Sequence, residues 1–482
     1  MMAPADAAAR LARRILLGRV RRGTPWTPGK HVEADAMKVA AWAASVSAAY
    51  RVLLLDHGID PRRMPRGVRW RDLPMLTKAA TFGRFALPEL SRSLQPGEIA
   101  DVLTSSGRSG QSFGFRLSAR REHERSWFAI DLGLQDAFNV DGLATLLVNC
   151  LPMGVVFRSR AVAVANVSVR EDMACAILRD IGPRFDQTLL CTDPVFIRRI
   201  LNEANQAGVD WTALNTSVIL GEETLAESQR DFIAAAMGID CDVDQHRSVA
   251  RSFGVGELGL SLLFESRETI RIRRAARRNG DLARLLGITD EEPDPPLVFC
   301  YSPFRVHVEV PTPGADGYGE LAFTMLGRTA VIPLPRFASG DVGRVLIPAD
   351  VARASAIAGV AAPWLPVVLL RGRAADRASG VPSIESVKQW LYEDHEQVSL
   401  LTGLFQLSPA AKPAELTLTL QAREGASEGQ RERVEAGLQR RRPASWPSMT
   451  LKVLSAEAFP GRPLADYERK PSYRFGFGTT AV

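Results

Sequence analysis

Four short segments of the chain carry residue types whose spacing suits phosphate, metal or sugar chemistry. The first, Thr104–Ser112, crowds hydroxyls and glycines together. Glycines let backbone N–H groups turn toward an anion, and hydroxyls add donors to phosphate oxygens. The spacing of Gly107 and Gly110, with no Gly-Lys-Ser/Thr after them, excludes a Walker loop. The segment therefore predicts a phosphate-binding loop, with a polar surface loop as the alternative.

The second segment, Phe253–Gly259, has the GxGxxG spacing of a dinucleotide-binding turn. Such a turn must follow a buried strand, whereas the preceding residues, Asp242–Ser252, are polar and charged. We therefore reject a dinucleotide fold. The carboxylate of Glu257 lies in this glycine-rich turn, where its oxygens are free to ligate a hard cation such as Mg²⁺.

Two further segments lie toward the C-terminus. Asp341 follows a glycine at an expected strand end, where a carboxylate can accept hydrogen bonds from both hydroxyls of a ribose. Arg371–Asp376 opens the C-terminal part of the chain. A zinc site built from Cys241, His246 and Cys300 would have poor spacing, and no GxSxG nucleophile elbow occurs.

In this order, the four segments resemble the motifs of the adenylate-forming superfamily of acyl-CoA ligases, most closely its phenylacetate–CoA ligase-like branch. The matching segments are Thr104–Ser112 for the phosphate loop, Phe253–Glu257 for Tyr-Gly-x-Thr-Glu, Arg336–Asp341 for Arg-Tyr-Arg-Thr-Gly-Asp and Gly372–Asp376 for the hinge. Three more likenesses are the adenine-side turn at Ile219–Glu223, the Leu-Pro-x-x-x-Lys motif at Leu73–Lys78 and the Gly-Glu-Leu strand at Gly319–Leu321. The resemblance covers about residues 40–480.

The chain departs from the family pattern at four positions. Gln111 stands where the family usually has Lys, so one phosphate contact loses its charge. Gly256 replaces the hydroxyl residue before the glutamate, Ala338 replaces an Arg, and Ala375 stands where the hinge usually has Asp or Lys.

The resemblance implies a role for each matching residue. Glu257 would be a catalytic residue that holds Mg²⁺, and Lys470, the lysine nearest the chain end, would be a second one that approaches the α-phosphate. Met153 and Gly154 would line the pocket for the acid. The residues that would contact the nucleotide are Thr104, Ser105, Ser106, Gly107, Ser109, Gly110, Gly221, Glu222, Glu223, Ser252, Phe253, Gly254, Asp341 and Arg373.

The resemblance also implies the reaction: ATP-dependent activation of a carboxylic acid to an acyl-adenylate, then transfer to a thiol, with the thiol of coenzyme A as the expected acceptor. The protein would be an AMP-forming acid–thiol ligase that uses ATP, Mg²⁺ and coenzyme A. Two alternatives stay open. One is transfer of the acyl group to a carrier protein, an amine or a cysteine, and the other is a degenerate nucleotide-binding homologue without activity. A homodimer is compatible with this interpretation, and nucleic acid is not an expected partner.

These residues need an α/β framework to position them. Buried strands are expected at Leu143–Asn149, Ala161–Val169, Thr188–Cys191 and Ser217–Leu220. Helices are expected over residues 38–58, ending at Gly58, over Thr192–Gly208, and from a capping box at Thr224 to Gly238. Alternation of strand and helix predicts an α/β core with much parallel sheet.

From about Leu297 the pattern becomes β-rich, with strands expected near Val306–Val310, Leu321–Leu326 and Ala330–Leu334. A smaller α+β part follows, with helices over 383–395 and 427–439 and strands at Leu416–Leu420 and Met449–Leu454. We expect a large N-terminal adenylation domain over residues 1–371 and a small mobile C-terminal domain over 372–482. Residues 1–35 form a basic leader, expected to be a solvated helix or a disordered segment, with contact to a membrane or to nucleic acid as the alternative.

Composition sets the outer limits. Of 482 residues, 46% are hydrophobic and 24% charged, as in ordinary globular proteins, and the net charge of +6 allows an anionic ligand such as a nucleotide. The five cysteines are widely spaced without a CxxC pair, which favours a reducing cytoplasm over a disulfide scaffold. No apolar run reaches the roughly 18–20 residues of a membrane span.

Overall fold

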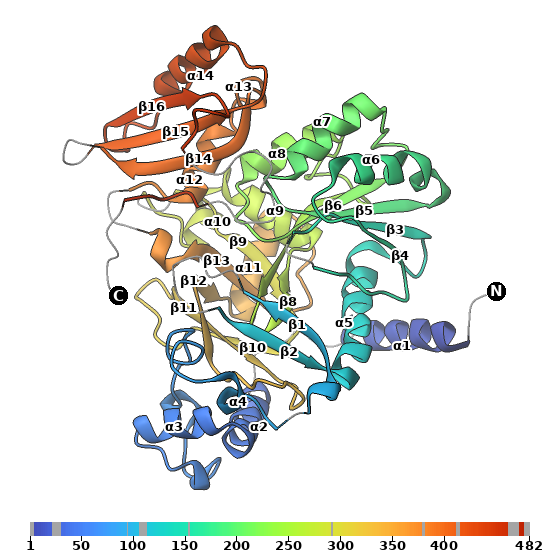
Figure 1. Ribbon diagram of the computed structural model, residues 1–482, viewed down its shortest axis with the longest axis vertical. Coiled ribbons are helices and arrows are strands. Elements are labelled where there is room, and N and C mark those ends of the chain that lie inside the picture. Colours follow the sequence, from blue (N-terminus) through green and yellow to red (C-terminus); the bar gives the residue numbers. More distant parts are fainter. Residues whose placement is uncertain are drawn as a thin grey trace. The chain divides into compact units, whose positions relative to one another are not determined.

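The computed structural model describes residues 4–21, 30–93, 95–105, 113–152, 155–290, 293–377, 381–410, 415–460 and 472–476. The chain forms two compact units, coloured along the sequence in Figure 1. The first unit comprises Met1–Thr145, Phe157–Val164 and Ala250–Ala374, and the second comprises Leu146–Val156, Ala165–Val249 and Ala375–Val482. The predicted boundary at residue 371 stays a prediction.

An antiparallel sheet forms the centre of the first unit. Its strand order is β10 (Val306–Glu309), β11 (Gly319–Met325), β12 (Phe337–Val345), β13 (Val367–Arg373), β9 (Leu297–Tyr301), β8 (Gly259–Phe264) and β7 (Val249–Val255). Side chains alternate between its faces, as a period of two residues requires. In β9, Leu297 and Phe299 join one core while Val298 and Cys300 join the other.

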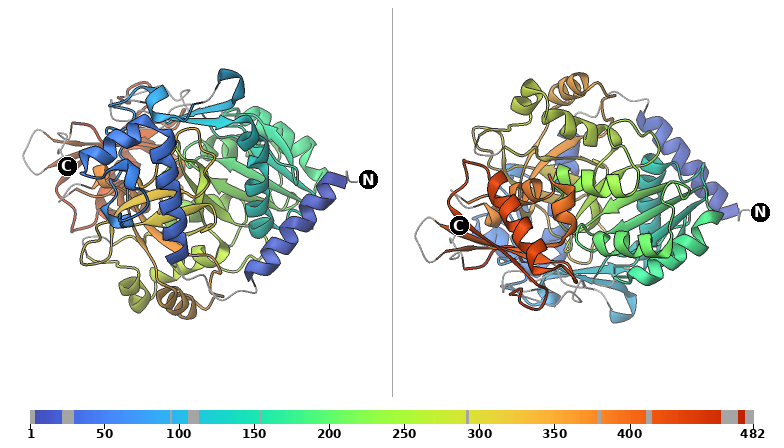
Figure 2. Two further views of the ribbon diagram at one scale, coloured as in Figure 1. Left: turned by 90° about the horizontal axis from the view of Figure 1, so that it is seen from below. Right: turned by 90° about the horizontal axis from the view of Figure 1, so that it is seen from above.

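Each face of this sheet carries its own hydrophobic core. One core includes residues of α2 (Lys30–Val46), α3 (Ala48–Asp56) and α4 (Leu87–Leu90), and the other includes residues of α9 (Arg267–Ala276), α10 (Gly280–Leu285) and α11 (Pro348–Ala358). Helices α10 and α11 lie side by side (Figure 2). The remaining elements are α1 (Pro4–Arg21), α5 (Arg120–Phe138), the hairpin of β1 (Ile99–Thr104) and β2 (Phe115–Ala119), and the 3₁₀ turns η1 (Pro61–Arg63), η2 (Trp70–Asp72), η3 (Pro96–Glu98) and η5 (Ala374–Asp376).

Two sequence predictions for the first unit are wrong. The helix expected over residues 38–58 is broken at Ser47, whose side chain accepts a hydrogen bond from the Tyr50 backbone N–H and thereby starts α3. The strand expected at Ala330–Leu334 is a loop between β11 and β12. Its proline cannot donate a backbone hydrogen bond to a neighbouring strand, and turns interrupt the extended backbone. Gly58, where the helix was expected to end, has a left-handed backbone with a φ of 71° and lies two residues after the end of α3 at Asp56.

A sheet with the order β6 (Thr216–Leu220), β5 (Gln187–Thr192), β3 (Thr145–Asn149) and β4 (Ala163–Asn166) lies in the second unit, with β5 and β6 parallel. Every residue of β3 and β5 is buried, as expected for parallel strands covered on both faces. Their core includes residues of α6 (Glu171–Asp180), α7 (Ile197–Ala207) and α8 (Glu227–Ala236), and η4 (Gly182–Arg184) follows α6. Strands are present at all four expected places, but the prediction that the Ala161–Val169 strand is buried is wrong: β4 lies at the edge of the sheet and its residues are half-buried or exposed. Helix α8 starts two residues later than the predicted capping box requires: Ala226 and not Thr224 occupies the N-cap position, so that Glu227 is the first helical residue.

The C-terminal part of the second unit is α+β. It contains α12 (Ile384–Leu391), α13 (His395–Ser399), β14 (Leu401–Pro409), β15 (Leu416–Ala422), α14 (Glu428–Arg441) and β16 (Met449–Leu454). Strand β15 pairs antiparallel with β14 and parallel with β16. Of the helices in the described ranges, none is by itself long and apolar enough to cross a membrane, and only α2 with α3, bent by 110°, pass that test as a pair.

The cap at Ser47 yields a stability prediction. Ser47 is buried, and its hydroxyl also donates to the Glu89 backbone carbonyl. We expect Ser47→Ala to lower the free energy of unfolding by about 1–2 kcal/mol, because the variant leaves buried polar groups unpaired. Urea denaturation measures this loss. Ser45→Ala, at an exposed position two residues earlier, is the matched control, and an equal effect of both variants would contradict the role of the cap.

Candidate active site

Two backbone segments meet at the base of the predicted phosphate loop. The Ser105 N–H donates to the Gly114 carbonyl at 3.0 Å, and the Gly114 N–H donates to the Ser105 hydroxyl oxygen at 3.1 Å. These bonds continue the pairing of β1 with β2, in which Thr104 and Phe115 are the last partners. The β1–β2 hairpin therefore fixes both ends of the intervening stretch.

A lysine that sequence reasoning did not select lies at this base. The Lys78 ammonium donates to the Ser105 hydroxyl at 2.7 Å and lies 3.0 Å from Oε1 of Glu257. The Glu257 side chain is 5% exposed and that of Lys78 is 21% exposed. The structure thus joins two predicted site residues, Ser105 and Glu257, through a cation that still reaches solvent. The only sequence signal for Lys78 was its place at the end of the Leu73–Lys78 motif.

Pairing to strand β12 positions Lys78. Leu76 forms an isolated parallel bridge with Phe337, and its N–H and carbonyl bond to Arg336 and Ala338 at 3.0 and 2.8 Å. The preceding residues are held by the Arg336 guanidinium, which donates to the carbonyls of Arg71 and Leu73.

Arg336 is itself fixed from two sides. Its guanidinium pairs with Glu309 at 3.1 Å and lies over the Trp70 ring, 5.6 Å from the centroid. Burial raises the pKa of Glu309, and Arg336 opposes that rise. Arg336 is 3% exposed, so its contacts indicate a structural role for this residue of the Arg336–Asp341 motif.

A tight hairpin places Glu257. Strands β7 and β8 pair antiparallel, with Val255 opposite Gly259 and Glu257 in the turn between them. The absence of a following helix confirms that this GxGxxG is not a dinucleotide turn, although a strand does precede it. Within the hairpin, the hydroxyls of Ser252 and Ser261 lie 2.9 Å apart, and the Phe253 ring stacks on Phe323 at 6.0 Å.

Close approach explains the departure at Gly256. A Cβ there would lie 2.9 Å from the Ser105 Cβ and 3.0 Å from the Ser105 Cα, which is closer than real Cβ atoms pack. A Cβ at Gly114 would likewise overlap the Glu257 carboxylate. The hydroxyl residue usual in the family at position 256 therefore has no room beside this loop base.

The predicted ribose residues are neighbours. Asp341 of β12 and Arg373 of β13 are directly paired partners in the antiparallel ladder, so their side chains lie on the same face. Asp341 is 6% exposed, its backbone follows Gly340 in the left-handed region (φ 78°), and Arg373 is exposed. A buried carboxylate beside an exposed guanidinium suits a polar ligand with hydroxyl groups.

The predicted adenine-side turn follows β6 in the second unit. The Gly221 N–H donates to the Thr192 carbonyl at 2.8 Å, and Glu222 has a φ of 68°, an uncommon backbone for a glutamate. The Glu223 carboxylate accepts hydrogen bonds from the Tyr473 hydroxyl at 2.6 Å and from the Lys388 ammonium at 3.2 Å.

Burial extends this network. Lys388 and Glu223 are 2% and 5% exposed, the Lys388 ammonium also donates to the Thr224 carbonyl at 3.1 Å, and it lies 4.7 Å from the centroid of the Tyr473 ring. Neither Lys388 nor Tyr473 was selected from the sequence, because their contacts with Glu223 span more than one hundred residues.

Several predicted residues lie outside the described ranges: Ser106, Gly107, Ser109, Gly110, Gln111, Met153, Gly154 and Lys470. The roles assigned to them stay predictions.

The number of carboxylates near Glu257 decides which kind of metal binding this site can support. In the described part of the chain, no group of three or more His, Cys, Asp or Glu residues is arranged to hold a metal. Glu257 therefore offers a single carboxylate. That set fits Mg²⁺, which commonly takes one or two protein carboxylates and completes its shell with phosphate oxygens and water. It does not fit a permanently bound structural metal.

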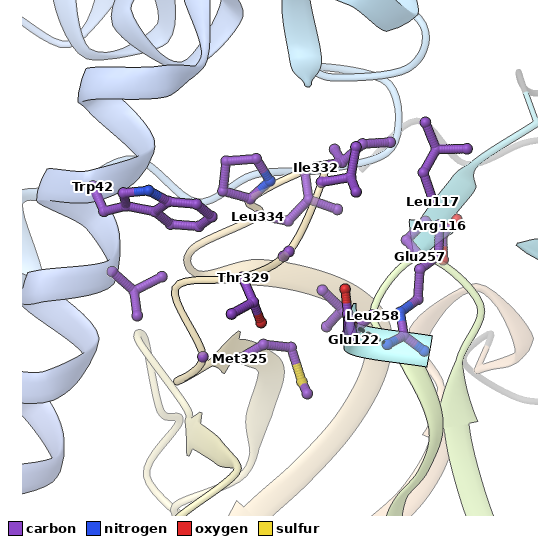
Figure 3. Close-up of a pocket in the computed structure, with 15 residues that line it drawn as sticks. Trp42, Arg116, Leu117, Glu122, Glu257, Leu258, Met325, Thr329, Ile332 and Leu334 are labelled. Atoms are coloured by element: carbon purple, nitrogen blue, oxygen red, sulfur yellow. Dashed lines mark hydrogen bonds and ion pairs between the residues drawn. The ribbon is translucent and has the colours of Figure 1, made fainter. Parts of the chain in front are cut away.

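A small cavity of about 70 Å³ is lined in part by Glu257 (Figure 3). Its polar lining includes the ion pair of Arg116 and Glu122, whose atoms lie 2.6 Å apart. Its apolar wall includes Trp42 of α2 and residues 330–334, the loop that was expected to be a strand.

Asp193, at the carboxyl end of β5, gives a pH prediction. Burial raises its pKa to about 6, and Glu223 and Glu222 add to the rise, against hydrogen bonds from the Phe196 and Val195 N–H groups. Between about pH 4 and 6 the native state therefore holds a proton that the unfolded chain has released, so stability falls as the pH rises through that window.

We expect Asp193→Asn to remove this pH dependence while its side-chain oxygen still accepts both backbone bonds. The variant should match the wild type near pH 4 and exceed its free energy of unfolding by roughly 1–3 kcal/mol at pH 7. Urea denaturation at both pH values measures the difference. Asp210→Asn is the control, since exposed Asp210 accepts the same pattern of two backbone bonds. A variant difference independent of pH would contradict the assignment.

Gly256→Thr tests the close approach by inserting the hydroxyl residue usual in the family. We expect it to destabilise the protein by about 1–3 kcal/mol, because its Cβ forces Ser105 away. Gly97→Thr is the control, since no atom lies within 4 Å of a Cβ at Gly97. Thermal unfolding compares the two, and an unchanged midpoint for Gly256→Thr would show that the loop base yields freely.

Comparison with known proteins gives a fold. No family model matches the chain, and no curated protein matches its sequence. Among solved structures, 2-hydroxyisobutyryl-CoA ligase in the postadenylation state with 2-HIB-AMP has a TM-score of 0.64 at 13% identity, over 94% of this chain and 91% of that chain. Its complex with R3-HIB-AMP has a TM-score of 0.63 at 13% identity, over 93% and 89%.

An open conformation of that ligase, with 2-HIB-AMP and CoA, has a TM-score of 0.52 at 14% identity, over 93% of this chain and 91% of that chain. Identity this low carries information on the fold alone. The α/β fold class and the small C-terminal α+β part expected from the sequence are confirmed: the chain has the fold of an acyl-CoA ligase.

Proposed function

We propose that the protein activates a carboxylic acid with ATP, forming an acyl-adenylate, and then transfers the acyl group to the thiol of coenzyme A. One observation carries this proposal: Lys78, Ser105 and Glu257 converge at the base of the glycine- and hydroxyl-rich loop. The fold shared with an acyl-CoA ligase supports it. Membership of the phenylacetate–CoA ligase-like branch is part of the same proposal and rests on the sequence motifs.

The chemistry sets what the site must do. A carboxylate oxygen attacks the α-phosphorus of ATP, the bond to the leaving pyrophosphate breaks, and an acyl-adenylate forms. The thiol then attacks the acyl carbon, and AMP leaves as the thioester forms. The first step brings two anions together, so the protein must orient them and offset growing phosphate charge.

Lys78 meets part of this need. Gln111 supplies no charge where the family usually has a loop lysine. The Lys78 ammonium, held at the base of the same loop by Ser105, would supply positive charge for the phosphates from a different part of the chain. Thr104, Ser105, Ser106, Gly107, Ser109 and Gly110 would donate to the phosphate oxygens.

Glu257 would hold Mg²⁺ that arrives with the nucleotide, and this metal neutralises phosphate charge when bound. The Glu257 carboxylate also pairs with Lys78 and so keeps the lysine oriented toward the base of the loop. Asp341 and Arg373 would bind the ribose.

The remaining roles are also proposals. Gly221, Glu222, Glu223, Ser252, Phe253 and Gly254 would line the nucleotide, Met153 and Gly154 would line the acid, and Lys470 would approach the α-phosphate. A carrier protein is the alternative acyl acceptor, and a homodimer is compatible with the proposed reaction.

The test is ATP–pyrophosphate exchange with a panel of carboxylic acids. We expect at least one acid to support exchange. Glu257→Gln, which keeps shape but removes charge, and Lys78→Met should each lower the rate by about 100-fold or more, as removal of transition-state electrostatics typically does. Lys38→Met is the control, because Lys38 lies on an exposed face of α2, where it pairs with Asp35 of the same helix.

Three outcomes would contradict the proposal. Normal exchange in folded Glu257→Gln and Lys78→Met would remove the site from the chemistry. Binding of ATP without exchange for any acid would favour a degenerate nucleotide-binding homologue. Exchange without a thioester product when coenzyme A is added would move the acyl acceptor to a carrier protein or an amine.

A further inference from the structure

Helix α1 carries the spacing of an amphipathic helix. Its small and apolar residues Ala8, Leu11, Ala12, Ile15 and Leu16 recur at i, i+3, i+4, i+7 and i+8. In a globular protein such a stripe faces the core. Here the stripe has the opposite orientation.

The large side chains of the stripe lie in solvent: Leu11 is 59% exposed, Ile15 47% and Leu16 38%. The helix packs instead through another face, on which Arg13 is 2% and Leu17 6% exposed. Helix α1 lies against α5 in the first unit (Figure 1). The protein therefore buries a charged residue of this helix and leaves its apolar residues outside.

Two buried carboxylates impose this orientation. Arg13 Nε donates to Asp141 at 3.2 Å, Arg13 Nη1 lies 3.5 Å from Asp131, and Arg10 donates to the Asp141 backbone carbonyl. Asp131 also accepts from the Ser159 hydroxyl at 2.5 Å. Rolling the helix to bury its apolar stripe would strip Arg13 from these partners and leave buried carboxylates without their cation, which is strongly unfavourable.

The charge around the stripe indicates what it contacts. Residues 1–22 contain six arginines and a single acidic residue, Asp6. Arg13 is neutralised internally, whereas Arg14 is exposed next to Ile15. An exposed apolar stripe with arginine at its margin is complementary to a surface that offers both apolar chains and negative charge.

We propose that α1 docks on an anionic lipid surface, with Leu11, Ile15 and Leu16 entering the boundary between headgroups and acyl chains and Arg14 contacting phosphate groups. A second copy of the chain fits less well. It would bring like-charged arginine-rich helices together, and three side chains cover much less than the ~800 Å² per partner of a stable interface.

The experiment is flotation of the full chain with vesicles of phosphatidylcholine alone or mixed with phosphatidylglycerol. We expect binding only to the mixed vesicles and weaker binding as salt is raised. Leu11→Ser with Ile15→Ser should lower the bound-to-free ratio at least about ten-fold, since two apolar side chains leave the membrane boundary. Arg14→Glu should lower it as well.

The matched control is Val52→Ser with Leu55→Ser, two exposed apolar residues of α3 (38% and 60% exposed), which should leave vesicle binding unchanged. Thermal unfolding checks that every variant is folded. Absence of binding to the mixed vesicles, or equal binding of the Leu11→Ser, Ile15→Ser variant, would overturn the proposal. Light scattering that shows a dimer lost in this variant would assign the stripe to a second copy instead. Neither result depends on the proposed acyl transfer.

Discussion

The candidate site depends on the contacts made by the buried guanidinium of Arg336. It holds the carbonyls of Arg71 and Leu73, stacks on Trp70 and pairs with Glu309. This anchors an N-terminal segment against strand β12, and the bridge from Leu76 to Phe337 then sets the position of Lys78. Loss of the guanidinium would leave a buried carboxylate unpaired and free the segment that carries the site cation. The structural ion pair of Arg336 with Glu309 and the Lys78–Glu257 ion pair of the proposed site are therefore linked through a few residues of backbone.

Local patterns were enough to predict much of the framework. Continuous apolar runs identify the buried strands β3, β5 and β6. The rejection of a dinucleotide turn around Glu257 is confirmed because strand β8 and not a helix follows it, but the reason given for it is wrong, since strand β7 does precede the turn. The sequence motifs are weak one by one, but their order along the chain predicts the fold. Ser105 and Glu257 were both selected, and they do converge.

What the sequence could not reveal are effects of long-range contacts. Lys78 reads as the end of a motif until Leu76 is seen to pair with a strand about 260 residues away. The break at Ser47 arises from a hydroxyl that caps a helix where apolar periodicity alone predicts continuity. Arg13 looks like one arginine of a solvated arm, yet it is buried because two aspartates of a distant segment receive it. In each case the deciding partner is remote in sequence.

The hydrogen bonds among Glu223, Lys388 and Tyr473 couple movements of distant parts of the second unit. A lysine from α12 and a phenol near the chain end both hold one carboxylate on the turn after β6, and all three groups are buried. Separating that turn from α12 would leave the buried ammonium and carboxylate without their partners, at a cost of about 3–5 kcal/mol for an unpaired buried charge. A displacement of the turn therefore moves the C-terminal α+β part with it, because the buried contacts resist separation. The turn and the C-terminal part could move independently only if another charged group replaced the partner that Glu223 or Lys388 loses.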